Sequence, residues 1–171
     1  MKKICFMLIA SLFSLQAIAA SNGGKKLVDF DKLYVGAGLG INSLSGYDGA
    51  TGYQFFAGAP LNIDAAGFNW SVEAGYMDSG SFKQSVTIPG FGTFSSTAKA
   101  TGLWATAVVD KPISDTLDFV GRAGLDIGDD DGIMFGAGVA YSLNPRSDIR
   151  FEYVIRSDVT SMQANFVYLL K

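Results

Sequence analysis

The sequence predicts an all-β fold in which eight antiparallel strands close into an up-and-down barrel, and three observations support this prediction. Eight segments alternate apolar residues with polar or small ones, as β-strands do because successive side chains point to opposite faces. The breaks between these segments are short and contain turn-forming residues, so sequential strands are expected to be antiparallel neighbours. The strand count is even, which allows the sheet to close and removes its open edges.

The first four predicted strands are short alternating runs. In 33–41, LYVGAGLGI, aliphatic residues alternate with a tyrosine and glycines, and in 52–59, GYQFFAGA, aromatic and alanine residues alternate with Gln, Phe and Gly. In 69–78, NWSVEAGYMD, a face with Trp and Tyr opposes Ser, Glu and Gly. In 98–109, AKATGLWATAVV, the tryptophan is assigned to the apolar face and the lysine to the opposite one.

The last four strands alternate more regularly. They are predicted at 117–126 (LDFVGRAGLD), 133–141 (IMFGAGVAY), 148–158 (DIRFEYVIRSD) and 161–170 (SMQANFVYLL). Most of the eight are close to the roughly 9–11 residues that cross a bilayer at a tilt. The segments between the strands are expected to be connections, and they are 42–51, 60–68, 80–97, 112–116, 128–132, 142–148 and 157–161.

The charged residues of these strands are predicted to share one face. The set is Glu73, Lys99, Asp118, Arg122, Asp126, Arg150, Glu152 and Arg156. It contains four cations and four anions and therefore sums to zero, as a filled lumen requires, because each unpaired buried charge costs several kcal/mol. The same face carries many glycines, which suit a lumen where eight strands leave space only for side chains.

The opposite face is apolar, and several of its aromatic residues lie close to strand ends. Aromatic residues at strand ends are typical of the interfacial girdle of a membrane barrel. The candidates for such a girdle are Trp70, Trp104, Tyr76, Tyr141 and Tyr168. The sequence thus favours a transmembrane β-barrel with a polar, filled interior. A soluble periplasmic barrel of lipocalin or avidin type, with apolar residues lining a ligand cavity, is the alternative of opposite sidedness.

The N-terminus predicts export. Lys2 and Lys3 precede an apolar run, and an A-x-A sequence ends at Ala19, which together indicate a cleaved signal peptide at 1–20. Residues 21–31 are expected to be a flexible leader, and residues 32–171 the barrel domain. No other run approaches the roughly 18 apolar residues of a membrane helix, so an exported chain of this kind is expected in a bacterial outer membrane.

At this point the sequence resembles the barrel-only members of the outer membrane protein A type of small eight-stranded barrels. The resemblance rests on LYVGAGLG, GYQF, WSVEAGY and GAGVAYSLNPRSDIRFEY, and covers roughly Leu33 to Leu170. It implies periplasmic termini and outer loops at 42–51, 79–96, 128–132 and 157–161. It also implies contact with outer-membrane lipid and lipopolysaccharide, and with the barrel-assembly machinery during biogenesis. A monomer is expected.

The connection between the third and fourth strands is the most individual part of the chain. It alternates on both sides of Pro89–Gly92, which favours a hairpin extending beyond the membrane. Its candidate contact residues, which are unusually apolar for a solvated loop, are Phe82, Val86, Ile88, Phe91 and Phe94. We therefore expect a structural or adhesion-like role with a host or surface ligand. A low-conductance channel through the polar lumen is the alternative.

Other functions have little support in the composition. The chain has no histidine, and no G-x-S-x-G elbow, so an activated hydroxyl nucleophile is not expected and no catalytic residue is assigned. The one cysteine, Cys5, lies in the predicted signal peptide, and Asp129–Asp131 lack the spacing of an EF-hand loop, so no metal or cofactor is expected. A net charge of −3 argues against a nucleic-acid partner.

Overall fold

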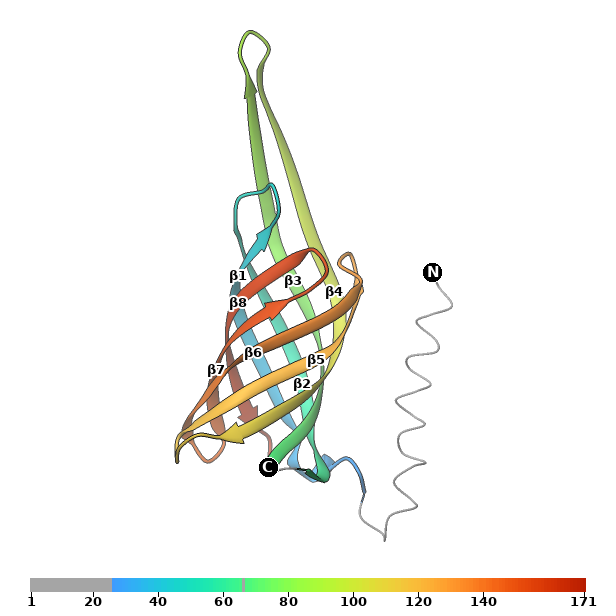
Figure 1. The fold of residues 1–171 in the computed structure, drawn as a ribbon, viewed down its shortest axis with the longest axis vertical. Coiled ribbons are helices and arrows are strands. Elements are labelled where there is room, and N and C mark those ends of the chain that lie inside the picture. Colours follow the sequence, from blue (N-terminus) through green and yellow to red (C-terminus); the bar gives the residue numbers. More distant parts are fainter. Residues whose placement is uncertain (1–25, 66) are drawn as a thin grey trace, which may run out of the picture.

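The computed structural model describes residues 26–65 and 67–171, which form a closed barrel of eight strands (Figure 1). Each strand pairs antiparallel with its neighbours in sequence, and β8 pairs with β1 to close the ring. The strands are β1 (Tyr34–Leu44), β2 (Ala50–Ala65), β3 (Phe68–Ile88), β4 (Gly92–Pro112), β5 (Leu117–Gly128), β6 (Gly132–Asn144), β7 (Ser147–Ile155) and β8 (Val159–Leu169). The predicted fold is confirmed, whereas the predicted signal peptide lies outside the described residues.

The barrel wall is apolar outside and largely polar inside, and β7 shows this alternation clearly. Phe151, Tyr153 and Ile155 are half exposed on the outer surface, while Glu152 and Val154 between them are buried, as is Arg150 before them. The same alternation, with the predicted sidedness, holds along β1, β3, β5, β6 and β8, and along most of β2. In the part of the chain that the structure describes, no helix is long and apolar enough to cross a membrane.

Strand β4 turns the face inward that was predicted to face outward. Trp104 and Val108 are buried inside the barrel, whereas Leu103 is 59% exposed on the outer wall. The pattern of β4 was ambiguous because both of its faces are small or apolar between 100 and 109. The interior decides the orientation, since the indole of Trp104 packs on Phe56 with ring centroids 5.7 Å apart and beneath the guanidinium of Arg122.

The connection predicted at 60–68 is mostly strand. β2 continues to Ala65 and β3 begins at Phe68, so the chain turns through Gly67, whose φ of +71° suits glycine. The described part of the predicted leader lies along this extension of β2. Val28 bridges Leu61, and the backbone nitrogen of Asp29 donates to the carbonyl of Pro60 at 2.8 Å. Phe30–Lys32 then form a single turn of 3-10 helix, labelled η2, before β1.

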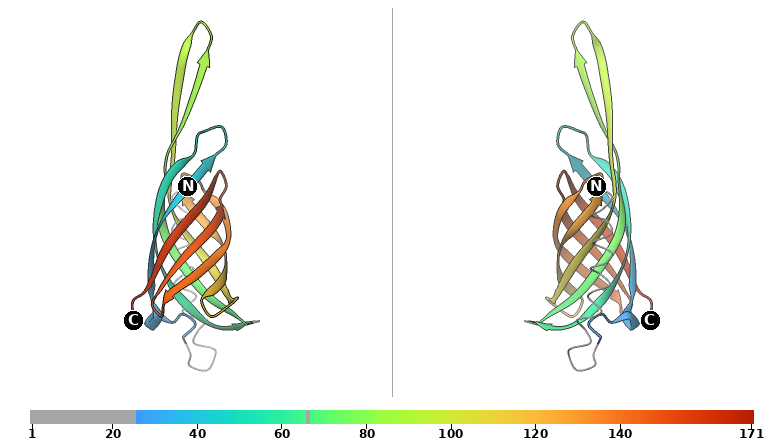
Figure 2. Two further views of the ribbon diagram at one scale, coloured as in Figure 1. Left: turned by 90° about the vertical axis from the view of Figure 1, so that its left-hand side faces the viewer. Right: turned by 90° about the vertical axis from the view of Figure 1, so that its right-hand side faces the viewer.

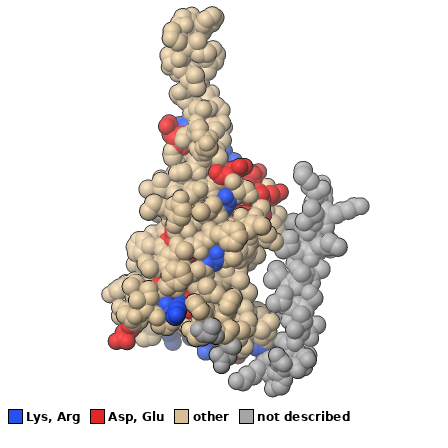
Figure 3. Space-filling model, viewed as in Figure 1, with Lys and Arg blue, Asp and Glu red and all other residues tan. Residues whose placement is uncertain are grey.

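The hairpin of β3 and β4 rises far above the other loops (Figure 2). β3 pairs with β2 only as far as Asp78, and β4 pairs with β5 only from Gly102 onward, so beyond these points the two strands pair with each other alone. Their register continues from the pair Phe82–Ala98 to the pair Ile88–Gly92. We call residues 81–99 of this hairpin the outer hairpin. Its upper part carries no Lys, Arg, Asp or Glu on the face drawn in Figure 3.

Candidate functional site

Three buried charges form the centre of the lumen. Nε and Nη2 of Arg122 on β5 donate to the two carboxylate oxygens of Glu152 on β7, both at 2.8 Å. The same Nη2 lies 3.3 Å from Oε2 of Glu73 on β3, and none of the three side chains is exposed to solvent. A bidentate Arg–carboxylate pair in a dry interior is both strong and directional, so this triad ties together three strands that are not sequence neighbours.

A second arginine completes the charge balance at Glu73. Nη1 of Arg150 donates to Oε1 of Glu73 at 2.5 Å, and the hydroxyl of Tyr34 on β1 donates to the same oxygen at 2.9 Å. That hydroxyl also lies 3.0 Å from Oγ of Ser71. Sequence reasoning missed Tyr34, although it occupies the glycine-rich face of its strand, where a large polar side chain can only point into the lumen.

Two amides extend the network toward β2 and β8. Nδ2 of Asn165 donates to Oε2 of Glu152 at 2.9 Å, and Nε2 of Gln54 donates to Oδ1 of Asn165 at 2.7 Å. Asn165 is fully buried and Gln54 nearly so. Both residues lie on the strand faces that carry the polar residues, so alternation places them in the lumen but does not reveal their partners.

A second polar cluster lies nearer the end of the barrel from which the outer hairpin extends. Nε of Arg156 donates to Oδ2 of Asp126 at 2.7 Å, and Nη1 of Arg156 donates to Oγ of Ser161 at 3.0 Å. The Ser161 hydroxyl donates to Oδ1 of Asn42, whose Nδ2 donates to the carbonyl of Ser79 at 2.8 Å. The cluster links β1, β3, β5 and β8 with Arg156, which directly follows β7, so the wall is braced from inside near its outer rim.

The prediction that Lys99 belongs to the lumen is wrong. Its side chain is 48% exposed, and its Nζ pairs with Oδ2 of Asp78 at 2.8 Å. The cause is the reversed orientation of β4, in which the odd-numbered residues face outward. At the level of Lys99, β4 has also left the barrel and pairs only with β3.

The predicted neutrality of the lumen holds only for part of the charge set. Arg122, Arg150 and Arg156 balance Glu73, Asp126 and Glu152, three cations against three anions. Asp118 is half-buried on the inner face of β5, and Asp110, which sequence reasoning missed, lies on the inner face of β4. Oδ1 of Asp110 has no hydrogen-bond partner among the described residues.

Glycines create the space that the large inner side chains fill. A Cβ at Gly75 would lie 2.7 Å from Cζ2 of Trp104, and one at Gly58 would fall 2.5 Å from the hydroxyl oxygen of Tyr34. The indole, the phenol and the ring of Phe56 therefore occupy positions above bare backbone. In a barrel of eight strands this exchange of small against large residues is what permits a packed lumen.

The lumen is filled rather than open in the part that the structure describes. A void lined by Asn42, Gln54, Met77, Arg156 and Gln163, among others, measures about 10 Å³. This is at the lower limit of the roughly 10–15 Å³ that one water molecule needs. A lumen packed in this way does not favour the low-conductance channel that the sequence left as an alternative, because a void of this size gives ions no room to pass.

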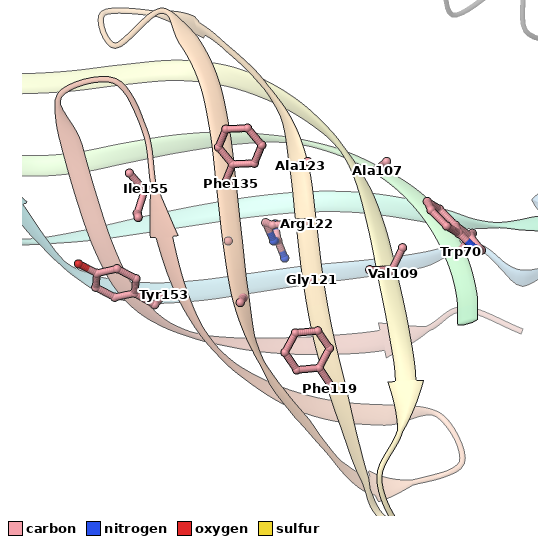
Figure 4. A pocket seen from close by; sticks show the side chains of 12 residues that line it. Trp70, Ala107, Val109, Phe119, Gly121, Arg122, Ala123, Phe135, Tyr153 and Ile155 are labelled. Carbon is pink, nitrogen blue, oxygen red and sulfur yellow. The ribbon is translucent and has the colours of Figure 1, made fainter. Parts of the chain in front are cut away.

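The larger hollows lie on the outer wall. One of about 550 Å³ has a floor of small residues between aromatic ridges that include Trp70, Phe119 and Phe135 (Figure 4). Of the predicted girdle residues, Trp70 lines this hollow, and Tyr76, Tyr141 and Tyr168 are 38–47% exposed on the outer wall. The fifth, Trp104, is wrongly assigned to the girdle because the structure buries it in the lumen.

The outer hairpin exposes four of its five predicted contact residues. Phe91 at the tip is 80% exposed, and Phe94, Val86 and Ile88 are 59%, 49% and 44% exposed. Phe82 is wrongly assigned to this set, because its side chain is fully buried. It follows the register shift between Asp78 and Ser81 and packs with other buried apolar residues inside the outer mouth of the barrel.

The three aspartates between β5 and β6 each stabilise a loop. Asp129 accepts the backbone nitrogen and the hydroxyl of Thr101, both at 2.9 Å, and Asp131 accepts the backbone nitrogen of Gly128. The carboxylate of Asp130 accepts two backbone nitrogens of the loop between β7 and β8, at 2.8 and 3.0 Å. Among the described residues, no group of acidic side chains is arranged to hold a metal ion.

Comparisons with known proteins agree with this architecture. The family model of the outer membrane protein β-barrel domain matches residues 5–169. A de novo designed transmembrane β-barrel is similar over 82% of this chain and 96% of its own, with 17% identity and a TM-score of 0.53. No curated protein matches the sequence.

Two natural barrels of known structure are more distant. Ail, the attachment invasion locus protein of Yersinia pestis, solved with the heparin analogue sucrose octasulfate, has 14% identity and a TM-score of 0.45 over 81% of this chain and 95% of its own. Neisserial surface protein A has 15% identity and a TM-score of 0.46 over 80% and 94%. The family match covers nearly the whole sequence, and the chain therefore belongs to the outer membrane protein β-barrel family, whose members lie in the bacterial outer membrane.

Proposed function

We propose that the protein is a non-enzymatic outer-membrane barrel that contacts surfaces outside the cell through its outer hairpin. The observation that supports this role most directly is the exposure of Phe91, Phe94, Val86 and Ile88 on a hairpin that rises above every other loop. Apolar side chains in such a position lower the solubility of a protein and are typical of contact sites. A ligand reaches them before it reaches the barrel.

The interior supports a structural role for the rest of the molecule. The central arginines and glutamates pair with each other, and the void beside Asn42, Arg156 and Gln163 is too small for a substrate. No histidine is available to act as a base near neutral pH. The lumen therefore serves to hold the wall together, and function is concentrated in the segments outside the membrane.

The proposal includes removal of residues 1–20 on export and a monomeric barrel. N-terminal sequencing of the protein from outer membranes is expected to start near Ala20 or Ser21. An N-terminus that begins at Met1 would contradict cleavage. Light scattering in detergent is expected to give the mass of one chain.

The contact role is tested by shortening the outer hairpin. Residues 83–97 are replaced by a two-residue Asn–Gly turn between the flanking strands, which removes the tip and leaves every barrel pair intact. Cells displaying the shortened protein are expected to lose binding to cultured epithelial cells and to extracellular matrix. The control is the same replacement at the loop between β5 and β6. Binding that is undiminished by the hairpin replacement would refute the proposal.

A further inference from the structure

The outer hairpin has one apolar face and one hydroxyl face. The cross-strand register pairs Val86 with Phe94, so their side chains share a face with Ile88. On the other face the hydroxyls of Ser85 and Ser95 lie 3.1 Å apart, and those of Thr87 and Thr93 lie 2.9 Å apart. The second face thus satisfies its own polar groups, while the first face leaves its apolar groups about half exposed.

The hairpin is also free of charge over a long stretch. Residues 84–98, QSVTIPGFGTFSSTA, contain no ionisable side chain, and Lys83 and Lys99 flank them at the base. The space-filling view shows the charges gathered below this protrusion (Figure 3). A segment without charge avoids the cost of several kcal/mol that each charge would add on entering a medium of low dielectric constant.

The apolar groups are confined to the end of the hairpin. From Val86 to Ile88 is two residue steps, about 7 Å of strand, and Phe91 lies beyond them in the turn. The apolar part of the hairpin is therefore about as long as the roughly 5–10 Å by which apolar side chains enter the boundary between lipid headgroups and acyl chains. Deeper entry is opposed by the backbone, because both edges of the hairpin leave N–H and C=O groups unpaired and hydrocarbon cannot satisfy them.

The area at the tip is small for a stable protein partner. Two phenylalanine side chains bury about 300–500 Å² when fully covered, and half-exposed Val86 and Ile88 add less than that. A specific protein interface needs about 800 Å² on each side, with a polar rim. A lipid surface needs no matching groove and tolerates an anchor of this size, as a weak and repeated contact.

We propose that the tip formed by Val86, Ile88, Phe91 and Phe94 inserts into the lipid bilayer of a facing cell or vesicle, at the boundary between headgroups and acyl chains. The inference rests on the proposed contact role and names the chemistry of its partner. The lysines at the base are too far from the tip to enter the same layer, so binding is expected to depend little on the charge of the lipid.

The test uses the full barrel in nanodiscs, which leaves the outer hairpin accessible. Co-sedimentation with sucrose-loaded vesicles of phosphatidylcholine alone is expected to exceed that of nanodiscs without protein. The variant F91S/F94S is expected to weaken binding about tenfold or more, because the apolar area in the boundary sets the affinity. The matched control is Thr97→Ser on the hydroxyl face, which is expected to bind as the parent does. Heat-modifiable migration in detergent gels verifies that each variant is folded.

The outcomes distinguish a failure of the lipid inference from a failure of the proposed contact role. Vesicle sedimentation no greater than that of empty nanodiscs, or unchanged in F91S/F94S, overturns lipid as the partner. If F91S/F94S then still reduces cell binding, the contact role stands and its partner is a protein or a glycan. If hairpin replacement leaves cell binding intact, the contact role itself fails. Vesicle binding in neutral lipid that F91S/F94S weakens about tenfold or more, as expected when apolar area in the boundary sets the affinity, supports the inference.

Discussion

Removal of the central arginine is the most informative perturbation of the lumen. Arg122→Met keeps an apolar stem in place of the arginine but removes the guanidinium, and with it both hydrogen bonds to Glu152 and the 3.3 Å contact with Glu73. Glu73 retains Arg150 and the Tyr34 hydroxyl. The carboxylate of Glu152 is therefore the group that loses most of its hydrogen bonds and its charge partner.

The magnitude follows from what remains around that carboxylate. In the variant, Glu152 keeps one hydrogen bond, from Nδ2 of Asn165 at 2.9 Å, in a site with no exposure to solvent. An uncompensated buried charge of this kind costs about 3–5 kcal/mol of the free energy of unfolding. The double variant R122M/E152M removes both charges and is expected to lose only about 0–2 kcal/mol, because apolar replacement of a buried ion pair is often close to neutral.

The assay is equilibrium unfolding by urea in lipid vesicles, followed by circular dichroism and tryptophan fluorescence. Arg146→Met, in the exposed turn between β6 and β7, is the matched control and should change the free energy of unfolding by less than about 0.5 kcal/mol. The reasoning is refuted if R122M lies within about 1 kcal/mol of the parent, or if R122M/E152M is less stable than R122M.

Three further predictions concern the wall, the lumen and a loop. Brominated acyl chains should strongly quench the fluorescence of Trp70 in the variant W104F, because Trp70 lies on the outer wall, and should only weakly quench that of the buried Trp104 in W70F. Equal quenching in the two variants would place both indoles on the outer wall. Gly138→Ala should lower the free energy of unfolding by about 1–3 kcal/mol, because its Cβ would lie 2.8 Å from a backbone Cα of the paired strand. Gly121→Ala, on the outer wall, should cost less than about 0.5 kcal/mol in the same urea assay, and equal losses would contradict the packed lumen. Asp130→Ala should speed amide exchange in the loop between β7 and β8 about tenfold or more, since each charged hydrogen bond contributes about 1.5–3 kcal/mol; unchanged protection would show that the carboxylate does not hold the loop.

Much of the candidate site could be predicted on strands where charged residues alternate regularly with large apolar ones. On β5 and β7 the alternation of Arg122 and Glu152 with aromatic and aliphatic residues leaves one consistent orientation, and both side chains lie in the lumen. Partners could not be predicted in the same way. Alternation assigns a side chain to a face, whereas the meeting of Glu73 with Arg122 and Arg150 depends on the stagger between strands around the closed ring.

The sequence by itself determined the number of strands, their antiparallel order and the face that β3, β5 and β7 turn inward, because a period of two is a local property of the chain. Only the tertiary structure decided the orientation of β4, the burial of Phe82 and the exposure of Lys99. Between residues 100 and 109 of β4, both faces carry only small or apolar residues, so the local pattern gives no preference. The choice is made by volume, since the glycines of neighbouring strands leave a space inside the barrel that the indole of Trp104 fills.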